Sequence, residues 1–210
     1  MSTALAVQPH DLLWGMPVFA LTEDAPDWCI EAISLGHPVV VRRQRVAAGL
    51  VAVGVRGRSR DQRYATVMAL ADIRRRVRPE QLVGPVKHNA NNWPALRALR
   101  QVRPLMEVLE LPWGVSGSAG FELASGIAAL HQDSDLDLIL RTPQFFDRQA
   151  AAHLLGALDD AVCRVDLQLQ TPMGAVALRE WAGSSRQVLL KADDGARLVD
   201  NPWPAFESVA

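Results

Sequence analysis

The chain has 210 residues, of which 49% are hydrophobic and 21% are charged. This composition indicates a globular protein with one large or two small cores, and it excludes a disordered or collagen-like chain. The two cysteines, Cys29 and Cys163, lie far apart in the sequence, which excludes a disulfide-rich scaffold and a CxxC zinc site. We expect a cytoplasmic protein without membrane association, because no apolar run reaches the roughly 18 residues of a membrane span and no basic segment opens a signal peptide.

The two halves of the sequence carry opposite charge, although the whole chain has a net charge of -1. Residues 1–104 hold 15 Lys and Arg against 8 Asp and Glu, whereas residues 105–210 hold 7 against 15. Eleven arginines lie between Arg42 and Arg78. Such a positive field attracts polyanions, which include nucleic acid, a polyphosphorylated cofactor and an acidic protein.

The first 82 residues predict a small α/β domain. We expect a helix over 27–35 and strands over 38–42 and 50–55. Ser59 with Gln62 three residues later has the spacing of a capping box, which predicts a helix that begins at Ser59 and is limited by Pro79. Residues 83–94 (VGPVKHNANNWP) are rich in Gly, Pro and Asn, so we expect a linker there.

Residues 95–210 predict a second domain of mixed helices and strands, and hence an α+β chain. Hydrophobic spacing predicts a helix over 93–109 that Pro104 interrupts, and a second helix over 119–130. Alternation predicts strands over 135–140 and 163–170, with a helix over 147–161 between them. Near the end, Asp194-Gly195 predicts a hairpin between 188–191 and 196–199.

Two carboxylates lie on one face of the strand at 135–140. Residues i and i+2 of a strand point to the same side, so Asp135 and Asp137 lie about 6.6 Å apart while Leu136 and Leu138 point toward a core. Adjacent carboxylates repel each other unless a cation separates them, and their oxygens suit Mg²⁺, with Mn²⁺ as an alternative. An isolated D-x-D pair can also be solvated surface charge, so the neighbouring residues decide between the two interpretations.

The neighbouring residues favour a phosphate site. Gly117-Ser118 at the start of a helix offers backbone N–H groups, a hydroxyl and the positive end of the helix dipole. Asp166 lies on the polar side of the strand at 163–170, where it supplies a third carboxylate if the two strands are neighbours. The candidate metal ligands and catalytic residues are therefore Asp135, Asp137 and Asp166.

The order of these residues resembles the polymerase-beta-like nucleotidyltransferase superfamily. Its pattern, hG[GS] before a helix followed by [ST]-D-h-D-h and a later strand Asp, is matched by Gly117-Ser118, by Ser134–Leu138 and by Asp166. A narrower resemblance, which covers nearly the whole chain, is to the malonate decarboxylase holo-acyl-carrier-protein synthases, also called phosphoribosyl-dephospho-CoA transferases. It is carried by Pro112–Leu140 (PWGVSGSAGFELASGIAALHQDSDLDLIL), Val53-Gly54-Val55-Arg56-Gly57 with Gln62-Arg63, Leu178–Trp181 and Val188–Lys191.

The resemblance implies a C-terminal nucleotidyltransferase-like domain with a mixed sheet flanked by helices. The implied reaction transfers the 2'-(5-triphosphoribosyl)-3'-dephospho-CoA prosthetic group to a serine of the acyl carrier protein subunit of malonate decarboxylase, and releases pyrophosphate. Asp135 and Asp137 would hold Mg²⁺ or Mn²⁺, while Asp166 would complete the metal shell or accept the proton of the serine hydroxyl. Gly117 and Ser118 would hold the departing phosphates.

The arginines of the N-terminal domain predict a docking surface for the donor phosphates or for the carrier protein. Arg56, Arg58, Arg60 and Arg63 crowd the predicted start of the helix at Ser59, where positive charge opposes the helix dipole and an anion would relieve the repulsion. The alternative is a solvated basic face.

Two other functions remain open. A generic metal-dependent nucleotidyltransferase, acting on a nucleotide, an RNA or a protein hydroxyl, would use the same aspartates. A non-enzymatic nucleic-acid-binding module would use the arginines alone, but residues 42–78 contain Tyr64 as their only stacking ring, so we rank it last.

Overall fold

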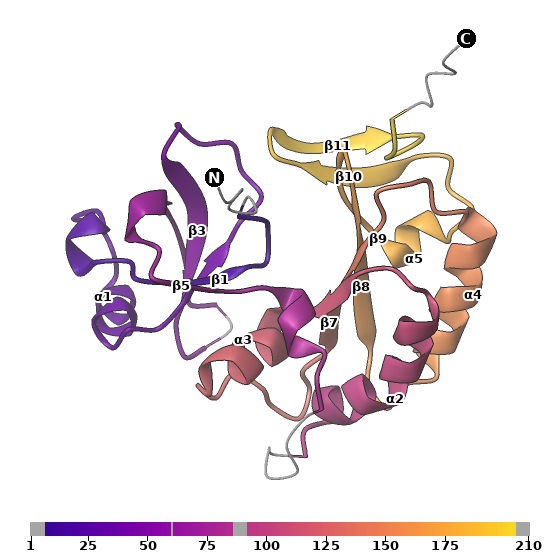
Figure 1. Cartoon of the computed structure of the whole chain (residues 1–210), viewed down its shortest axis with the longest axis horizontal. Helices are drawn as coiled ribbons and strands as arrows, with labels where there is room; N and C mark the ends of the chain where they lie inside the picture. Colours follow the sequence, from indigo (N-terminus) through magenta and orange to yellow (C-terminus); the bar gives the residue numbers. More distant parts are fainter. Residues whose placement is uncertain (1–6, 60, 86–91, 205–210) are drawn as a thin grey trace, which may run out of the picture.

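The computed structural model describes residues 7–59, 61–85 and 92–204. Within these ranges, the chain forms two sheets, one in each half of the sequence, with helices packed on both (Figure 1). The predicted α+β class, with an N-terminal and a C-terminal domain, is confirmed. In the described part of the chain, no helix combines the length and the apolar character that crossing a membrane requires.

The N-terminal domain contains an antiparallel sheet, which in the described residues has the order β4-β3-β2-β1-β5. Its strands are β1 (Leu12–Trp14), β2 (Val39–Val41), β3 (Leu50–Arg56), β4 (Arg63–Ala69) and β5 (Arg75–Val77). Helix α1 (Asp27–Ser34) packs against β3, and the short helices η1 (Val18–Ala20), η2 (Leu70–Asp72) and η3 (Pro79–Leu82) lie in the connections. The core gathers buried side chains from the sheet and α1, among them Leu13, Cys29, Val53 and Met68.

The predicted helix from Ser59 to Pro79 is wrong. The side-chain oxygen of Gln62 accepts bonds from the backbone N–H groups of Arg58 and Ser59, at 2.9 and 3.3 Å, so these residues close the turn between β3 and β4. Residues 63–69 then pair with β3 along its whole length. The cluster Arg74–Arg76 consequently lies at β5, where Arg76 forms an ion pair of 2.6 Å with the fully buried Asp11.

The C-terminal domain contains a mixed sheet, which the described residues form in the order β11-β10-β9-β8-β7-β6. Its strands are β6 (Trp113–Val115), β7 (Leu136–Arg141), β8 (Val165–Thr171), β9 (Gly174–Ala177), β10 (Val188–Ala192) and β11 (Gly195–Val199). Strands β7 and β8 are parallel, and the other pairs are antiparallel. The helices are α2 (Pro94–Val108), α3 (Gly117–Ser125), α4 (Arg148–Asp159) and α5 (Leu178–Trp181).

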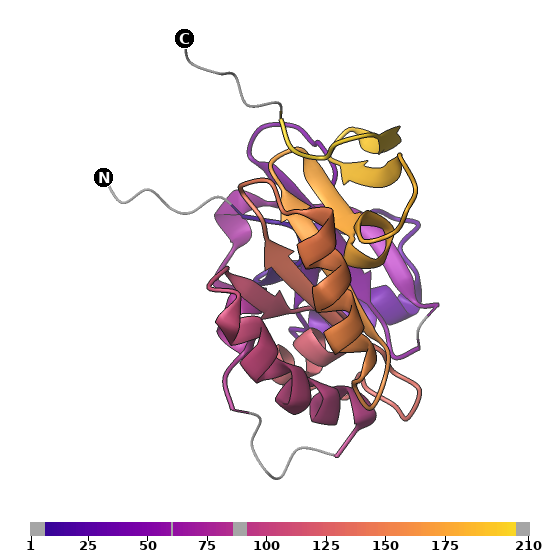
Figure 2. The ribbon, with the colours of Figure 1, turned by 90° about the vertical axis from the view of Figure 1, so that its right-hand side faces the viewer.

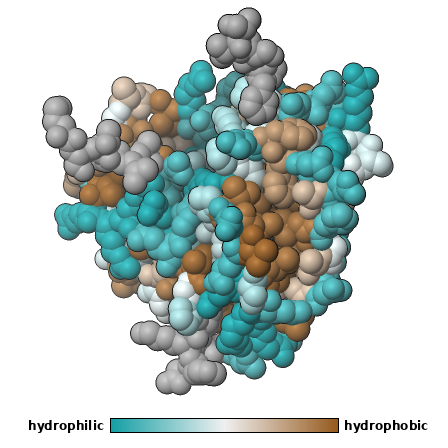
Figure 3. All heavy atoms as spheres, turned by 45° about the vertical axis from the view of Figure 1, so that its right-hand side comes forward, coloured by the Kyte–Doolittle hydropathy of each residue, from teal (hydrophilic) through white to brown (hydrophobic). Residues whose placement is uncertain are grey.

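Helices α2 and α4 lie together on one face of this sheet, as Figure 2 shows. Leu136, Leu138, Leu167 and Leu169 belong to the buried core that also contains side chains of α2 and α4. The opposite face of β7 and β8 carries the polar residues, because side chains alternate along a strand. On the side of the molecule drawn in Figure 3, hydrophobic side chains gather near the middle and hydrophilic ones surround them.

Several predicted boundaries shift in the structure. Helix α2 continues through Pro104, whereas α3 begins at Gly117 and ends at Ser125, before Gly126 adopts a left-handed conformation with φ 74°. Of the predicted linker 83–94, residues 86–91 lie outside the described ranges, and Val83 and Trp93 pack against the C-terminal core. The domain limits at 82 and 95 stay predictions.

Candidate active site

A cavity of about 510 Å³ lies between the two domains, and we call it the interdomain cavity. The N-terminal domain contributes His10, Arg56 and Arg63 to its lining, and the C-terminal domain contributes Gly117, Asp137 and Gln168. The cavity therefore joins cationic side chains of the positive half to a carboxylate and a helix start of the negative half.

Two of the three predicted carboxylates lie side by side on the polar face of the sheet. Asp137 of β7 is paired in register with Asp166 of β8, and both side chains are half-buried. Both line a second cavity of about 310 Å³, the sheet cavity, and Asp137 lines the interdomain cavity as well. The Asp166 carboxylate accepts a bond of 2.9 Å from Arg164. The predicted adjacency of these two strands is thus present in the structure.

Asp135 lies just before β7, and it is absent from the described lining of both cavities. It is instead close to Cys163: burial raises the pKa of the Cys163 thiol, and the negative charge of Asp135 raises it further. The structure therefore brings Asp137 and Asp166 together and places Asp135 at the margin of the pair.

Gly117 fits against the Asp137 side chain. Its φ is +59°, and a Cβ atom at this position would lie 1.8 Å from Oδ2 of Asp137. The backbone N–H of the preceding Ser116 donates a bond of 2.9 Å to the carbonyl oxygen of Asp137. Only glycine leaves room for this approach, so the first turn of α3 presents its backbone N–H groups directly beside the carboxylate.

Arg56 connects the N-terminal domain to this helix start. From the end of β3, its guanidinium donates bonds of 3.0 Å to Oγ of Ser118 and 3.3 Å to the carbonyl oxygen of Ala129, and it lies 5.5 Å from the ring centre of Phe121. Burial and the nearby Arg63 lower the pKa of Arg56, while Asp137 and Glu122 raise it. A guanidinium that is partly desolvated beside backbone donors favours an anionic ligand.

The four predicted arginines do not form a single group at a helix start, because that helix is absent. Arg63 lies opposite Arg56 in the β3–β4 pairing and lines the same cavity. The Arg58 side chain is 87% exposed and pairs with Glu31 at 3.0 Å, beside a third cavity of about 380 Å³. Arg60 lies outside the described residues. Substrate binding by Arg58 and Arg60 stays a prediction.

Sequence reasoning missed His10 as a member of the site. It precedes β1 and has a φ of 75°, which is uncommon for a residue with a side chain. Its pKa is lowered to about 4, first by burial and then by the positive charges of Arg43, Arg141 and Lys191. No motif in the sequence marks it, since Gln168, Arg141 and Lys191 approach it from the other domain.

The chemistry of the donor atoms fits a divalent metal ion such as Mg²⁺. Asp137 and Asp166 offer carboxylate oxygens in one cavity, next to a turn that has no room for a side chain at Gly117. In the part of the chain that the structure describes, however, no three His, Cys, Asp or Glu side chains are gathered closely enough to hold an ion. The metal set Asp135, Asp137 and Asp166 therefore stays a prediction.

Comparisons with known proteins match the chain over almost its full length. The family model of the phosphoribosyl-dephospho-CoA transferase MdcG N-terminal domain matches residues 8–79, and that of the C-terminal domain matches residues 81–202. A phosphoribosyl-dephospho-CoA transferase of Pseudomonas syringae pv. tomato is 61% identical over 210 residues, covering 100% of both chains. Proteins of the same name from Pseudomonas putida strain GB-1 and Azotobacter vinelandii are 54% and 52% identical, covering 98% and 96% of this chain and 99% and 96% of their own.

No solved structure matches the chain. The family assignment therefore rests on the two domain matches and on relatives that share more than half of their residues with this sequence over its whole length. The chain belongs to the phosphoribosyl-dephospho-CoA transferase family.

Proposed function

We propose that this protein transfers the 2'-(5-triphosphoribosyl)-3'-dephospho-CoA prosthetic group to a serine of the acyl carrier protein subunit of malonate decarboxylase, with release of pyrophosphate. The names of the relatives support the donor class. The observation that carries the proposal is the meeting of Arg56, the Gly117–Ser118 turn and Asp137 in one cavity between the domains.

The cavity has the groups that phosphoryl transfer requires. Such reactions depend mainly on positioning and on neutralising charge, because the transition state spreads negative charge over the phosphate oxygens. Arg56 and Arg63 provide fixed positive charge on one wall, and the start of α3 provides backbone N–H donors on the other. In this proposal the two departing phosphates lie against the Arg56 guanidinium and Ser118, which are already in contact with each other.

Asp135, Asp137 and Asp166 would hold Mg²⁺, or Mn²⁺, beside the triphosphate. A bound ion of this kind supplies charge neutralisation for the phosphate oxygens. The residues of the chain orient the donor from one side: the Asp137 carboxylate would hold the ion that faces the reacting phosphate, and the adjacent Gly117 backbone would donate to its oxygens. The carrier serine is then the group that must reach this phosphate.

The direct test is incubation of the protein with the apo carrier subunit and triphosphoribosyl-dephospho-CoA, with intact-mass spectrometry of the carrier. We expect the mass of one phosphoribosyl-dephospho-CoA group to be added, and one pyrophosphate to be released for each carrier. Asp137→Ala and Asp135→Ala should each abolish the adduct, whereas Asp133→Ala should not, because Asp133 is an exposed acid of the same loop. An unmodified carrier with the wild-type protein would overturn the proposal.

The generic nucleotidyltransferase remains the alternative, since it would use the same carboxylates. The same assay separates the two functions if ATP replaces the triphosphoribosyl donor. Transfer from ATP at a similar rate would favour the generic activity. The nucleic-acid-binding alternative loses support from the structure, because Arg43, Arg56 and Arg76 make contacts within the protein.

A further inference from the structure

His10 and the turn at Gly117 lie on opposite sides of Asp137. In the sheet, β7 has β6 on one side and β8 on the other. The turn at Gly117 follows β6 and is bonded to Asp137 through Ser116. The His10 imidazole instead hydrogen-bonds Gln168 of β8. The leaving group held at the turn and the His10 side chain are therefore on opposite sides of the strand that carries Asp137.

Gln168 lies close to the two carboxylates along the sheet. Gln168 comes two residues after Asp166 on the same face, which is about 6.6 Å along a strand. The residue that the imidazole contacts is thus one side-chain repeat from the Asp137–Asp166 pair, and His10, Asp137 and Gln168 all line the interdomain cavity.

The fold holds His10 in an uncommon backbone conformation. At its φ of 75°, the His10 N–H donates a bond of 2.9 Å to the carbonyl oxygen of Val41. The next residue, Asp11, is fully buried, where its carboxylate accepts from the N–H of Gln8 at 2.8 Å and pairs with Arg76. Backbone strain of this kind is retained where the surrounding contacts fix it, and it is concentrated at functional sites.

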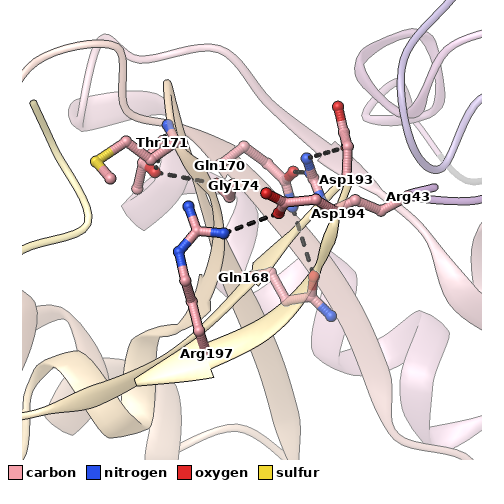
Figure 4. Close-up of polar contacts among 9 residues, drawn as sticks. Arg43, Gln168, Gln170, Thr171, Gly174, Asp193, Asp194 and Arg197 are labelled. Atoms are coloured by element: carbon pink, nitrogen blue, oxygen red, sulfur yellow. Dashed lines mark hydrogen bonds and ion pairs between the residues drawn. The ribbon is translucent and has the colours of Figure 1, made fainter. Parts of the chain in front are cut away.

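A chain of hydrogen bonds that runs from Arg43 to Gln168 fixes the orientation of the imidazole. Arg43 of the N-terminal domain pairs with Asp193 and donates to the side-chain oxygen of Gln170, and Gln170 donates to Gln168 at 3.5 Å (Figure 4). Gln168 then contacts His10. A base whose second partner is held in place is the arrangement that general base catalysis uses.

We propose that His10 accepts the proton of the carrier's serine hydroxyl; this inference rests on the function proposed above. An in-line displacement requires the nucleophile and the leaving group on opposite sides of the phosphorus. The serine oxygen forms a bond to the α-phosphorus as the bond to the pyrophosphate oxygen breaks, and the bonding electrons leave with pyrophosphate. The hydroxyl proton moves to the imidazole, which later returns it to solvent.

The charges around His10 support this role. The groups that face it are Gln168 and the cations Arg43, Arg141 and Lys191, while the neighbouring Asp11 is engaged by Arg76. With a pKa of about 4, the imidazole is unprotonated at neutral pH and can take up a proton. A bound polyanionic donor offsets the three cations and so removes their part of the lowering of the pKa, whereas the larger effect of burial remains.

His10→Asn is the most informative variant. Asparagine tolerates the left-handed backbone and can keep a bond to Gln168, but it has no basic nitrogen. We expect kcat to fall by about 10²- to 10³-fold, with a donor KM within about threefold of the wild type, because a general base contributes on this scale. The acidic limb of the kcat–pH profile should disappear. His153→Asn, on the exposed side of α4, should leave kcat and the profile unchanged.

A second variant separates the loss of the base from a loss of the fold. His10→Gly accepts the positive φ without strain, and added imidazole should restore part of its turnover. A His10→Asn enzyme that keeps its kcat, or that loses activity with the acidic limb intact or through donor KM alone, would overturn the inference. Failure of the proposed function itself is distinguishable, because the wild-type protein would then leave the carrier unmodified.

Discussion

A side chain at Gly117 would collide with the candidate site. Its Cβ would lie 1.8 Å from the Asp137 carboxylate, and its φ is +59°. Both features fix the start of α3 directly beside the Asp137 side chain, as the proposed phosphate site requires. The role of this glycine therefore follows from geometry, in addition to the sequence pattern that drew attention to it.

We predict that Gly117→Ala loses at least 100-fold in prosthetic-group transfer and costs about 1–3 kcal/mol of stability, because the methyl group displaces Asp137 and strains the backbone. Intact-mass spectrometry of the carrier and urea unfolding measure the two effects. The matched control is Gly156→Ala in α4, where the new methyl meets nothing within 4 Å beyond its chain neighbours and the backbone of its own helix. It should stabilise the helix by about 0.5–1 kcal/mol and leave transfer intact; normal transfer by Gly117→Ala would contradict the account.

His10 makes the stability of the protein depend on pH. Its folded-state pKa of about 4 lies below the ordinary value of 6.5, so the unfolded chain binds more protons between these values. The stabilisation is complete above pH 6.5 and is lost as the pH falls to 4. The loss is on the order of 3 kcal/mol for a shift of this size.

We predict that the free energy of unfolding of the wild type, measured with urea, falls more steeply between pH 7 and pH 4.5 than that of His10→Asn. The variant lacks the titrating group. The difference between the two slopes isolates His10 from the carboxylates that titrate in the same range. Equal slopes for the two proteins would show that His10 is not held neutral by the fold.

At the scale of elements, the β3–β4 hairpin contains Val53–Gly57 and Gln62-Arg63, two segments that carry part of the family resemblance. The contacts within the hairpin explain why these residue types are needed there. A Cβ at Gly57 would lie 2.4 Å from the side-chain oxygen of Gln62 and 2.8 Å from the ring of Trp28. Gln62 caps the turn through two backbone N–H groups. The hairpin thereby directs Arg56 across the domain boundary to Ser118.

Gln62→Ala should therefore impair donor binding more than catalysis. Losing the capping bonds costs about 1 kcal/mol in the position of the turn, which corresponds to roughly a fivefold rise in the donor KM. Steady-state kinetics with the apo carrier at saturation measure this value. Gln149→Ala, on the exposed surface of α4, is the matched control and should behave as the wild type. An unchanged donor KM in Gln62→Ala would show that the turn does not position Arg56.

The elements that the sequence predicts correctly are those with local signals. The alternation of 163–170 and the run at 135–140 predict β8 and β7, and the Asp194-Gly195 turn predicts the β10–β11 hairpin. The segment after Ser59 misled the prediction because the Gln62 side chain bonds the backbone in a hairpin turn with the same spacing as in a capping box. The three-residue strands β1, β5 and β6 were missed, since so short a segment shows too little alternation to identify.

At the scale of the whole molecule, two halves of opposite charge meet around the interdomain cavity. At one place on this boundary Arg56 bonds Ser118, and at another Arg43 contacts Gln170 and Asp193. The N–H of Arg45 adds a bond of 2.8 Å to the carbonyl oxygen of Asp193. The charge asymmetry was visible in the sequence, but these contacts join residues that lie between 62 and 150 positions apart, which no local pattern reveals.

Arg43→Met should loosen the domain boundary. The side chain of Arg43 is 19% exposed, so its loss leaves Gln170 without a partner on that side and frees the β10–β11 turn. We expect faster hydrogen exchange at residues 192–195 and a several-fold slower transfer, with hydrogen exchange measured by mass spectrometry. Arg197→Met is the control, because Arg197 pairs with Asp194 within the same hairpin (Figure 4). Equal exchange in the two variants would contradict a bridging role for Arg43.

The candidate site shows the same limit of prediction as the fold. Alternation predicts that Asp137 and Asp166 lie on the polar faces of their strands, and a turn signal predicts Gly117 at a helix start, but the register that aligns the two carboxylates comes from the structure. The approach of Arg56 to Ser118 and of His10 to Gln168 depends on how the domains pack. The part of the cavity wall that the N-terminal domain contributes is therefore determined by tertiary structure alone.

The most direct measurement is a crystal structure of the protein with bound triphosphoribosyl-dephospho-CoA. The account predicts density for the triphosphate in the interdomain cavity, with its oxygens within hydrogen-bonding distance of the Arg56 guanidinium, Ser118 and the backbone N–H of Gly117. Phosphates bound at the exposed Arg58, or in the sheet cavity away from Arg56, would contradict it.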